Sequence, residues 1–258
     1  MTDHVRVSVE DGVMRIAFNR PDKKNAITNA MYLALSESLQ RAETDPQIRV
    51  VLFEAEGDAF TAGNDIADFA AVAAGTLARG DMKVHAFLEA LARGRKPYVA
   101  AVQGLAVGIG TTMLMHCDLV FVAEDAKLST PFVNLALVPE AASSWLIPAR
   151  IGYGRAFAMF ALGDAVDGRS AAALGLANAA LPVGEVRTKA LEAAQALARK
   201  PAGALQATKS LMRDGAAIAA VMQRESDVFA QRLQSAEARE AFRAFAERRP
   251  ADFSKFSG

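Results

Sequence analysis

Three glycines in residues 97–118, PYVAAVQGLAVGIGTTMLMHCD, could allow the main chain to bind an anion. Gly104, Gly108 and Gly110 follow an apolar run typical of a β-strand, and an uncharged helical pattern begins at Gly110. The first N–H groups of a helix have no partners within it, and glycine lets them approach a ligand closely. The stretch therefore predicts a main-chain site for a negatively charged oxygen.

Three other interpretations of these residues are open. A membrane-spanning helix would fit the uncharged run and the spacing of Gly104 and Gly108, but Gln103 and His116 are poor partners for lipid. A dinucleotide-binding turn fails at Met113, where its pattern requires a third glycine. Tight packing of a helix on a strand, with no ligand, would use the same glycines.

A second strand, loop and helix unit precedes this one. Residues 50–53 form a buried apolar run, residues 57–65 (GDAFTAGND) are small and turn-forming, and a weakly amphipathic run continues through Phe69. An ordinary connection would have the same composition. Two such units could nevertheless direct two main-chain N–H groups at one atom.

Glu140 is a lone carboxylate between the apolar residues 132–138 and the small residues 141–144. The plain interpretation is an acid in the first turn of a helix that interacts with the helix dipole. Alternatively, the apolar run would exclude water from the carboxylate and raise its pKa toward neutrality, which suits a group that transfers protons. The helix dipole would oppose that rise.

The elements that must position these groups change character along the chain. Alternating apolar residues predict a hairpin around Asp11 and Gly12, and Thr28 is the predicted N-cap of the next helix. A helix is predicted for residues 81–93, a bend for residues 127–131, and mainly helices from Ile151 onward. The sequence therefore predicts an α/β core, residues 1–196, followed by a helical region, residues 197–258. These last helices need a surface to pack on, either the body of the chain or a neighbouring subunit.

Composition narrows the range of partners. Of 258 residues, 52% are hydrophobic, and 29 basic side chains balance 29 acidic ones, so nothing indicates nucleic acid or a membrane as a partner. Cys117 is the only cysteine and the N-terminus lacks a leader pattern, which predicts a cytoplasmic location without an internal disulfide. His4, His85 and His116 are far apart in sequence, so no metal site is expected.

Four segments together resemble the enoyl-CoA hydratase/isomerase (crotonase) superfamily, over nearly the whole chain. They are residues 20–26, residues 59–65, residues 103–110, and Cys117-Asp118 with Pro131-Phe132 beyond. The resemblance implies a crotonase-like α/β spiral of ββα turns, with trimerisation helices in residues 197–258 and assembly into homotrimers or homohexamers. It also implies an acyl-CoA thioester as substrate, with no cofactor other than the coenzyme A that the substrate carries.

The resemblance also assigns residues to the site. The thioester carbonyl would lie between the N–H groups of Ala62 and Ile109, and each such donor contributes about 3–4 kcal/mol to stabilising an enolate. Lys23, Lys24, Arg248 and Arg249 are candidates for the coenzyme A phosphates, although Lys23 and Arg249 read more plainly as solvated surface charges. Asp65 is expected to cap the helix that follows it. The implied substrate-binding positions are Lys24, Ala26, Ala62, Gly63, Asn64, Asp65, Gly108, Phe132 and Arg248.

The sequence departs from the hydratase pattern at two positions. Hydratases of this superfamily carry two glutamates that handle water, which would fall at Thr112 and Phe132, and neither side chain can transfer protons as hydration requires. Residues 139–144, PEAASS, are instead similar to the segment that holds the single glutamate of Δ3,Δ2-enoyl-CoA isomerases. The sequence therefore predicts an enoyl-CoA isomerase in which Glu140 carries the proton.

Other functions remain open at this point. The same superfamily contains dehalogenases and acyl-CoA hydrolases, in which a carboxylate near Glu140 attacks as a nucleophile. A non-catalytic protein that binds acyl-CoA would also lack both hydratase glutamates. A serine hydrolase that uses Ser143 or Ser144 is disfavoured because the chain has no Gly-x-Ser-x-Gly turn.

Overall fold

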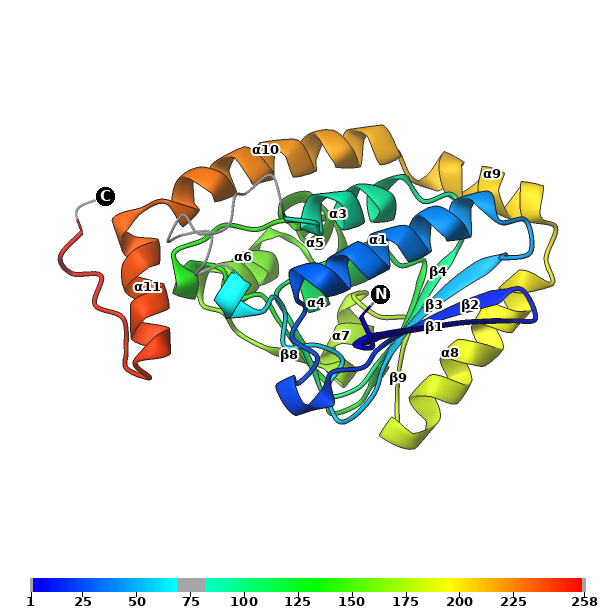
Figure 1. Cartoon of the computed structure of the whole chain (residues 1–258), viewed down its shortest axis with the longest axis horizontal. Coiled ribbons are helices and arrows are strands. Elements are labelled where there is room, and N and C mark those ends of the chain that lie inside the picture. The colour runs from blue at the N-terminus through cyan, green and yellow to red at the C-terminus, as the bar shows by residue number, and fades with distance from the viewer. Residues whose placement is uncertain (1, 69–81, 257–258) are drawn as a thin grey trace.

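The computed structural model describes residues 2–68 and 82–256. A six-stranded sheet lies at its centre, in the order β1-β2-β3-β4-β6-β9 (Figure 1). β1 and β2 are antiparallel, and every other neighbouring pair is parallel. The strands are β1 (Val5–Glu10), β2 (Val13–Phe18), β3 (Val50–Ala55), β4 (Tyr98–Val102), β6 (Leu119–Ala123) and β9 (Ala179–Leu181).

The first hairpin and the central strands agree with the sequence pattern. Asp11 and Gly12 have φ angles of 50° and 78°, as a two-residue type I′ turn requires, so the predicted hairpin is confirmed. Every residue of β3 and β4 is buried. Figure 1 shows α1 (Asn29–Thr44) on one side of these strands and α8 (Val183–Ala198) on the other. A parallel sheet covered on both faces needs continuous apolar strands, which explains their composition.

A second, three-stranded sheet has the order β5-β7-β8. It comprises β5 (Leu105–Val107), β7 (Lys127–Ser129) and β8 (Val166–Asp167). The chain passes from β4 to β5 and from β6 to β7, so successive turns contribute one strand to each sheet. The predicted bend at residues 127–131 is wrong at residues 127–129. Only Leu128 of that strand is buried, so three residues gave no detectable periodicity.

The helices connect these strands and cover the sheet. Thr28 accepts a hydrogen bond from the Met31 N–H at 3.3 Å, so the predicted N-cap of α1 is confirmed. The helix predicted for residues 81–93 is α3 (Val84–Arg93), and Asp81 lies outside the described residues. Residues 66–68 are helical as predicted, and Phe69 lies outside the described residues. The remaining short elements are η1 (Pro21–Lys23), α4 (Ile109–Thr112), η3 (Met113–His116), η4 (Val133–Leu135), α5 (Ser143–Ile151), α6 (Tyr153–Ala161) and α7 (Gly168–Leu174).

The C-terminal region consists of α9 (Ala202–Met212), α10 (Gly215–Leu233) and α11 (Ala236–Ala246). α10 runs along α3 (Figure 1), and α11 packs against η4. The region therefore packs on the body of its own chain, and α8 crosses the predicted boundary between residues 196 and 197. Within residues 2–68 and 82–256, no helix has the length and apolar character needed to cross a membrane. The same residues contain no cluster of three or more potential metal ligands from His, Cys, Asp and Glu.

Candidate active site

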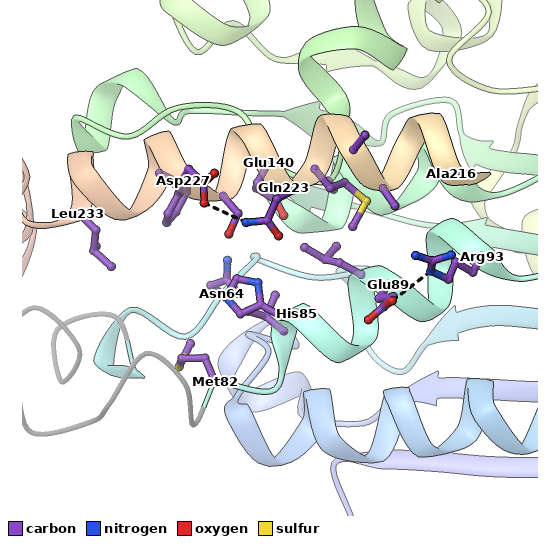
Figure 2. Close-up of a pocket in the computed structure, with 18 residues that line it drawn as sticks. Asn64, Met82, His85, Glu89, Arg93, Glu140, Ala216, Gln223, Asp227 and Leu233 are labelled. Atoms are coloured by element: carbon purple, nitrogen blue, oxygen red, sulfur yellow. Dashed lines mark hydrogen bonds and ion pairs between the residues drawn. The ribbon is translucent and has the colours of Figure 1, made fainter. Parts of the chain in front are cut away.

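Glu140 lies at the wall of a cavity of about 680 Å³ between α3 and α10 (Figure 2). Surrounding protein shields its carboxyl from water and raises its pKa to about 8, and the negative charge of Glu225 acts in the same direction. Thr112 donates a hydrogen bond to Glu140 Oε1 at 2.5 Å, which partly opposes the rise. The predicted increase of the Glu140 pKa is thus present, and it brings the carboxyl close to neutral pH.

The plain interpretation of Glu140 as a first-turn helix acid is wrong. α5 begins at Ser143, three residues after Glu140, and its N-cap residue is Ala142. Ala141 and Ala142 have φ angles of 60° and 57°, a left-handed pair that turns the chain between Glu140 and the helix. The carboxylate that serves the α5 N-terminus comes instead from α10, where Glu225 accepts hydrogen bonds from two main-chain N–H groups of this turn.

A buried histidine holds the other side of the same turn. His116 Nε2 is 2.7 Å from the Ala141 carbonyl oxygen, and its Nδ1 is 2.6 Å from Arg213 Nη2. Burial and the adjacent Arg213 charge lower the pKa of His116 to about 3, so the ring is neutral. A neutral ring satisfies both contacts when Nε2–H donates to Ala141 and Nδ1 accepts from Arg213. His116 thereby connects the segment after α4 with the residue after Glu140.

The cavity wall carries both apolar and polar side chains. Leu88 of α3 and Met222 of α10 supply apolar surface from the two helices. Arg93 pairs with Glu89 at 3.0 Å, and Gln223, which lies beside Glu140 in Figure 2, donates to Asp227 at 2.9 Å. The space between two helices therefore offers apolar surface for an apolar chain together with polar groups close to Glu140. The other lining residues are Asn64, Met82, Val84, His85, Ala141, Ala216, Ala219, Ala220, Ser226, Phe229 and Leu233.

The loop after β3 brings Asn64 to this cavity, and not the predicted donor Ala62. The Ala62 N–H donates to the Lys24 carbonyl at 2.8 Å, so Ala62 as an oxyanion donor is a wrong prediction. Asn64 lines the cavity instead. Gly63 O and the Asp65 N–H both bond to Ile27, in a parallel bridge that directs the N–H of Asn64 itself away from Ile27. The structure gives this N–H no acceptor among the described residues.

Two contacts fix that loop. The Tyr32 hydroxyl, which is fully buried, donates to Asn64 Oδ1. A second parallel bridge joins Thr61 to Ala106 of β5 and brings Gly63 so close to Val107 that a Cβ would lie 2.7 Å from its carbonyl oxygen. The Asn64 N–H is therefore held next to the segment that enters α4.

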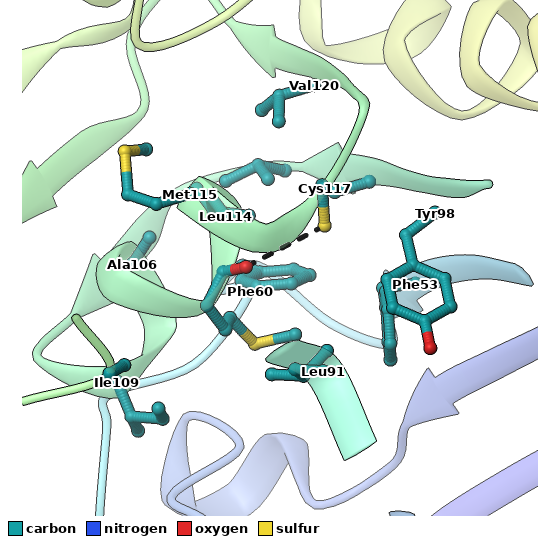
Figure 3. Close-up of a cluster of buried hydrophobic side chains, with 14 of the residues drawn as sticks. Phe53, Phe60, Leu91, Tyr98, Ala106, Ile109, Leu114, Met115, Cys117 and Val120 are labelled. Carbon is teal, nitrogen blue, oxygen red and sulfur yellow. Dashed lines mark hydrogen bonds between the residues drawn. The ribbon is translucent and has the colours of Figure 1, made fainter. Parts of the chain in front are cut away.

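The other predicted donor, Ile109, is the first residue of α4. The Gly108 carbonyl accepts hydrogen bonds from the N–H groups of Thr111 and Thr112, and the Gly108 N–H donates to the Ser129 carbonyl. The Ile109 N–H, in contrast, has no acceptor in the described part of the chain. Its side chain is buried in the core (Figure 3). The residues 97–118 thus form β4, β5, α4 and η3, so the alternative of a membrane-spanning helix is wrong.

Two of the three glycines of this stretch allow close packing, and the third does not. A Cβ on Gly104 would lie 1.9 Å from the Asp58 carbonyl oxygen, and one on Gly110 would lie 2.5 Å from Thr61 Cγ2, so both are needed for close packing. Gly108 has φ 56° and ψ −119°, and a Cβ there would meet nothing within 4 Å. A side chain at Gly108 would therefore meet no neighbour, so its positive φ rather than crowding favours glycine, and Gly108 is not among the residues that line the cavity.

The remaining predicted residues lie around or away from the cavity. Ala26 accepts a hydrogen bond from Arg20 Nη1 at 3.0 Å, and Lys24 is exposed and pairs with Asp58 at 2.5 Å. Asp65 accepts from the Ala67 N–H at 3.1 Å, which agrees with its predicted role as a cap, and it also pairs with Arg20.

Phe132 and the basic residues near the C-terminus do not line the cavity. Phe132 is buried against Phe160 at a ring distance of 6.2 Å. Arg249 pairs with Glu240 and Glu247, and Arg248 is exposed after α11. In a single chain these residues therefore do not contact the space beside Glu140.

Sequence reasoning missed the groups that hold Glu140 in place. Glu225 lies on the inward side of α10 together with Ile218, Val221 and Met222, at helical spacing, and an acid among apolar positions was the available signal. For His116 and Arg213 the sequence offered no such signal, because their contact joins residues 97 positions apart.

Comparison with known proteins identifies the family of this chain. The sequence matches the enoyl-CoA hydratase/isomerase family over residues 8–255, so the chain belongs to that family. It is 32% identical to enoyl-CoA delta isomerase 2 from Rattus norvegicus over 95% of this chain, but it spans only 64% of the rat protein's length. It is 30% identical to 2,3-dehydroadipyl-CoA hydratase from Escherichia coli (strain K12), over 96% of this chain and 97% of that protein.

The fold agrees with this assignment. A crystal structure of an enoyl-CoA hydratase/isomerase from Pseudoalteromonas atlantica T6c superimposes with a TM-score of 0.92 and 37% identity, over 98% of this chain and 100% of that one. The crotonase-like α/β fold predicted from the sequence is therefore confirmed. Relatives named as isomerases and as hydratases both occur, so the names do not decide the reaction.

Proposed function

We propose that this protein is an acyl-CoA enzyme that moves a double bond from C3 to C2 of a 3-enoyl-CoA thioester, with Glu140 as its proton carrier. One observation supports this most strongly: the Glu140 carboxyl has a pKa raised to about 8 and lies at the wall of a cavity lined by both apolar and polar side chains. Such a group holds and releases a proton near neutral pH. At pH 7 roughly one tenth of it is ionised, since one pH unit is a factor of ten.

The proposed reaction uses one acid and two main-chain donors. Ionised Glu140 removes a proton from C2, and the electrons of that C–H bond form an enolate whose charge lies on the thioester oxygen. The N–H groups of Asn64 and Ile109 stabilise this oxygen without rearranging. Protonated Glu140 then returns the proton to C4, and the double bond lies between C2 and C3. No cofactor is needed, because coenzyme A arrives as part of the substrate.

The surroundings of Glu140 support isomerisation over hydration. The two hydratase positions hold Thr112, whose hydroxyl is occupied by Glu140, and Phe132, which is buried away from the cavity. Neither can activate water.

A spectrophotometric assay of the wild-type protein tests this function. With 3-enoyl-CoA thioesters of several chain lengths, we expect isomerisation at least about 100-fold faster than hydration of the matching 2-enoyl-CoA, since acid–base groups contribute that much or more. Equal rates would contradict the proposal, and so would binding without turnover. An acyl group trapped on Glu140 and detected by mass spectrometry would indicate a nucleophile instead.

We also propose that the helical region, residues 197–258, forms a homotrimer or homohexamer. Leu211 and Met212 at the end of α9 are 89% and 83% exposed, and Phe245 of α11 is 57% exposed, which is costly for apolar side chains in a lone chain. Light scattering coupled to size exclusion should give three or six copies, and a monomer would contradict this. A cytoplasmic location stays a prediction.

A further inference from the structure

Glu225 is a buried acid in the middle of α10, with 8% of its surface exposed. Its Oε2 accepts a hydrogen bond from the Ala142 N–H at 2.6 Å, and its Oε1 accepts one from the Ser144 N–H at 2.9 Å. Both donors belong to the N-terminal end of α5, which has no side-chain cap of its own. One carboxylate therefore bridges the turn that carries Glu140 from a helix more than eighty positions away in the sequence.

We propose that Glu225 is a positioning residue for Glu140: its carboxylate fixes the turn that presents Glu140 to the cavity and supplies the negative charge that offsets the N-terminus of α5. The enzymatic part of this inference rests on the proposed function. It assigns to Glu225 the interaction with the helix end that the sequence attributed to Glu140.

The charge of Glu225 matters as much as its hydrogen bonds. The free N–H groups at a helix N-terminus are equivalent to about half a positive charge, which would favour the ionised form of a carboxyl three residues away. Glu225 cancels that field, and its own charge raises the pKa of Glu140 further. Burial raises the pKa of Glu225, but the side-chain hydrogen bond from Ser144, the two amide bonds and the charge of Arg224 oppose that rise, and these donors suit a carboxylate better than an acid.

Other titratable groups near Glu140 do not replace Glu225. Tyr32 of α1 stays neutral because burial raises its pKa far above its usual range, and His116 of η3 stays neutral because its pKa is lowered to about 3. Glu225 is the charged group that raises the pKa of Glu140, as far as the described residues show. The charged or titratable side chains along the cavity wall are His85, Glu89 and Arg93 of α3 and Asp227 of α10.

Two variants separate the effect of the Glu225 charge from the effect of its side-chain length. Glu225→Gln removes the charge and leaves an oxygen for one amide, and Glu225→Asp keeps the charge but is one methylene shorter, so it cannot bridge both amides. Glu192→Gln, in an exposed position on α8, is the matched control. Circular dichroism establishes that each variant folds.

The test measures the titration of Glu140 directly, by NMR of protein labelled with 13C at the glutamate carboxyl, with the Glu140 signal assigned from Glu140→Gln. We expect Glu225→Gln to lower the midpoint by up to roughly one pH unit, because burial causes most of the rise and the charge of Glu225 the smaller part. We expect Glu225→Asp to keep the midpoint near that of the wild type but to lower kcat about tenfold or more without a matching change in KM.

An unchanged Glu140 midpoint in Glu225→Gln would overturn the inference, and so would unchanged kcat in Glu225→Asp. If Glu225→Gln fails to fold, Glu225→Asp alone tests the inference: a lower kcat supports it, and an unchanged kcat overturns it. The NMR result does not depend on the reaction. A wild-type protein without isomerase activity would refute the proposed function, while the titration would still decide the role of Glu225.

Discussion

Replacing Glu140 with glutamine should stabilise the protein, and the gain should increase with pH. In the unfolded chain this carboxyl ionises near its usual pKa of 4.5, whereas in the fold it keeps its proton until about pH 8. Between these values the folded state binds one more proton than the unfolded state. The free energy of unfolding of the wild type therefore falls as pH rises through this window.

The size of the effect follows from the shift. Each unit of pKa difference corresponds to about 1.4 kcal/mol, so a rise from 4.5 to about 8 gives roughly 5 kcal/mol as an upper bound. Glutamine does not ionise, and its side-chain oxygen can still accept from Thr112. The stability difference between Glu140→Gln and the wild type should therefore be small at pH 4.5 and grow by about 3–5 kcal/mol by pH 9.

Urea unfolding at pH 4.5, 6, 7.5 and 9 measures this difference. Glu192→Gln, an exposed glutamate on α8, serves as the control and should track the wild type at every pH. Parallel curves for Glu140→Gln and the wild type would refute the reasoning, because they would mean that the Glu140 carboxyl titrates alike in both states.

Three further predictions concern the groups around Glu140. Thr112→Val removes the hydrogen bond that lowers the Glu140 pKa, so the acid limb of the pH profile of kcat/KM should move to higher pH. Thr112→Ser keeps a hydroxyl and should leave the acid limb at its wild-type position; an unchanged profile in Thr112→Val would contradict the role of this hydrogen bond. Gly63→Ala places a Cβ 2.7 Å from the Val107 carbonyl oxygen at a φ of 91°, so turnover should fall roughly 100-fold, whereas Gly184→Ala, where nothing lies within 4 Å, should leave it unchanged. His116→Leu removes the partner of the Ala141 carbonyl and of Arg213 Nη2, so urea unfolding should show a loss of about 2–4 kcal/mol, and unchanged stability would refute the contact.

Much of the fold could be predicted because local patterns determine it. Continuous apolar runs marked β3 and β4, and Thr28 marked the start of α1. Short strands such as β7 escaped detection, because three residues do not establish a period. Family resemblance then supplied the spiral arrangement, which no single segment encodes.

The site was only partly predictable, because it depends on contacts between distant segments. Residues 57–65 indicated a loop whose amides could bind a ligand. In the structure a bridge to Ile27 leaves the N–H of Asn64 without an acceptor among the described residues, whereas the N–H of Ala62 donates to the Lys24 carbonyl. The sequence likewise indicated that Glu140 would be desolvated, but not that Glu225 of α10 would bind the turn beside it and raise its pKa further. Which amides and carboxylates are hydrogen-bonded to each other depends on the tertiary structure, so the composition of a segment cannot predict it.

The most direct test of Glu140 as the proton carrier compares turnover and binding in one variant. Glu140→Gln keeps the size of the side chain and removes its ability to transfer a proton. We expect 3-enoyl-CoA isomerisation to fall by at least about 1,000-fold, while a non-isomerisable saturated acyl-CoA binds within about threefold of the wild type in calorimetry. Isomerisation near the wild-type rate in a folded Glu140→Gln protein would contradict the account.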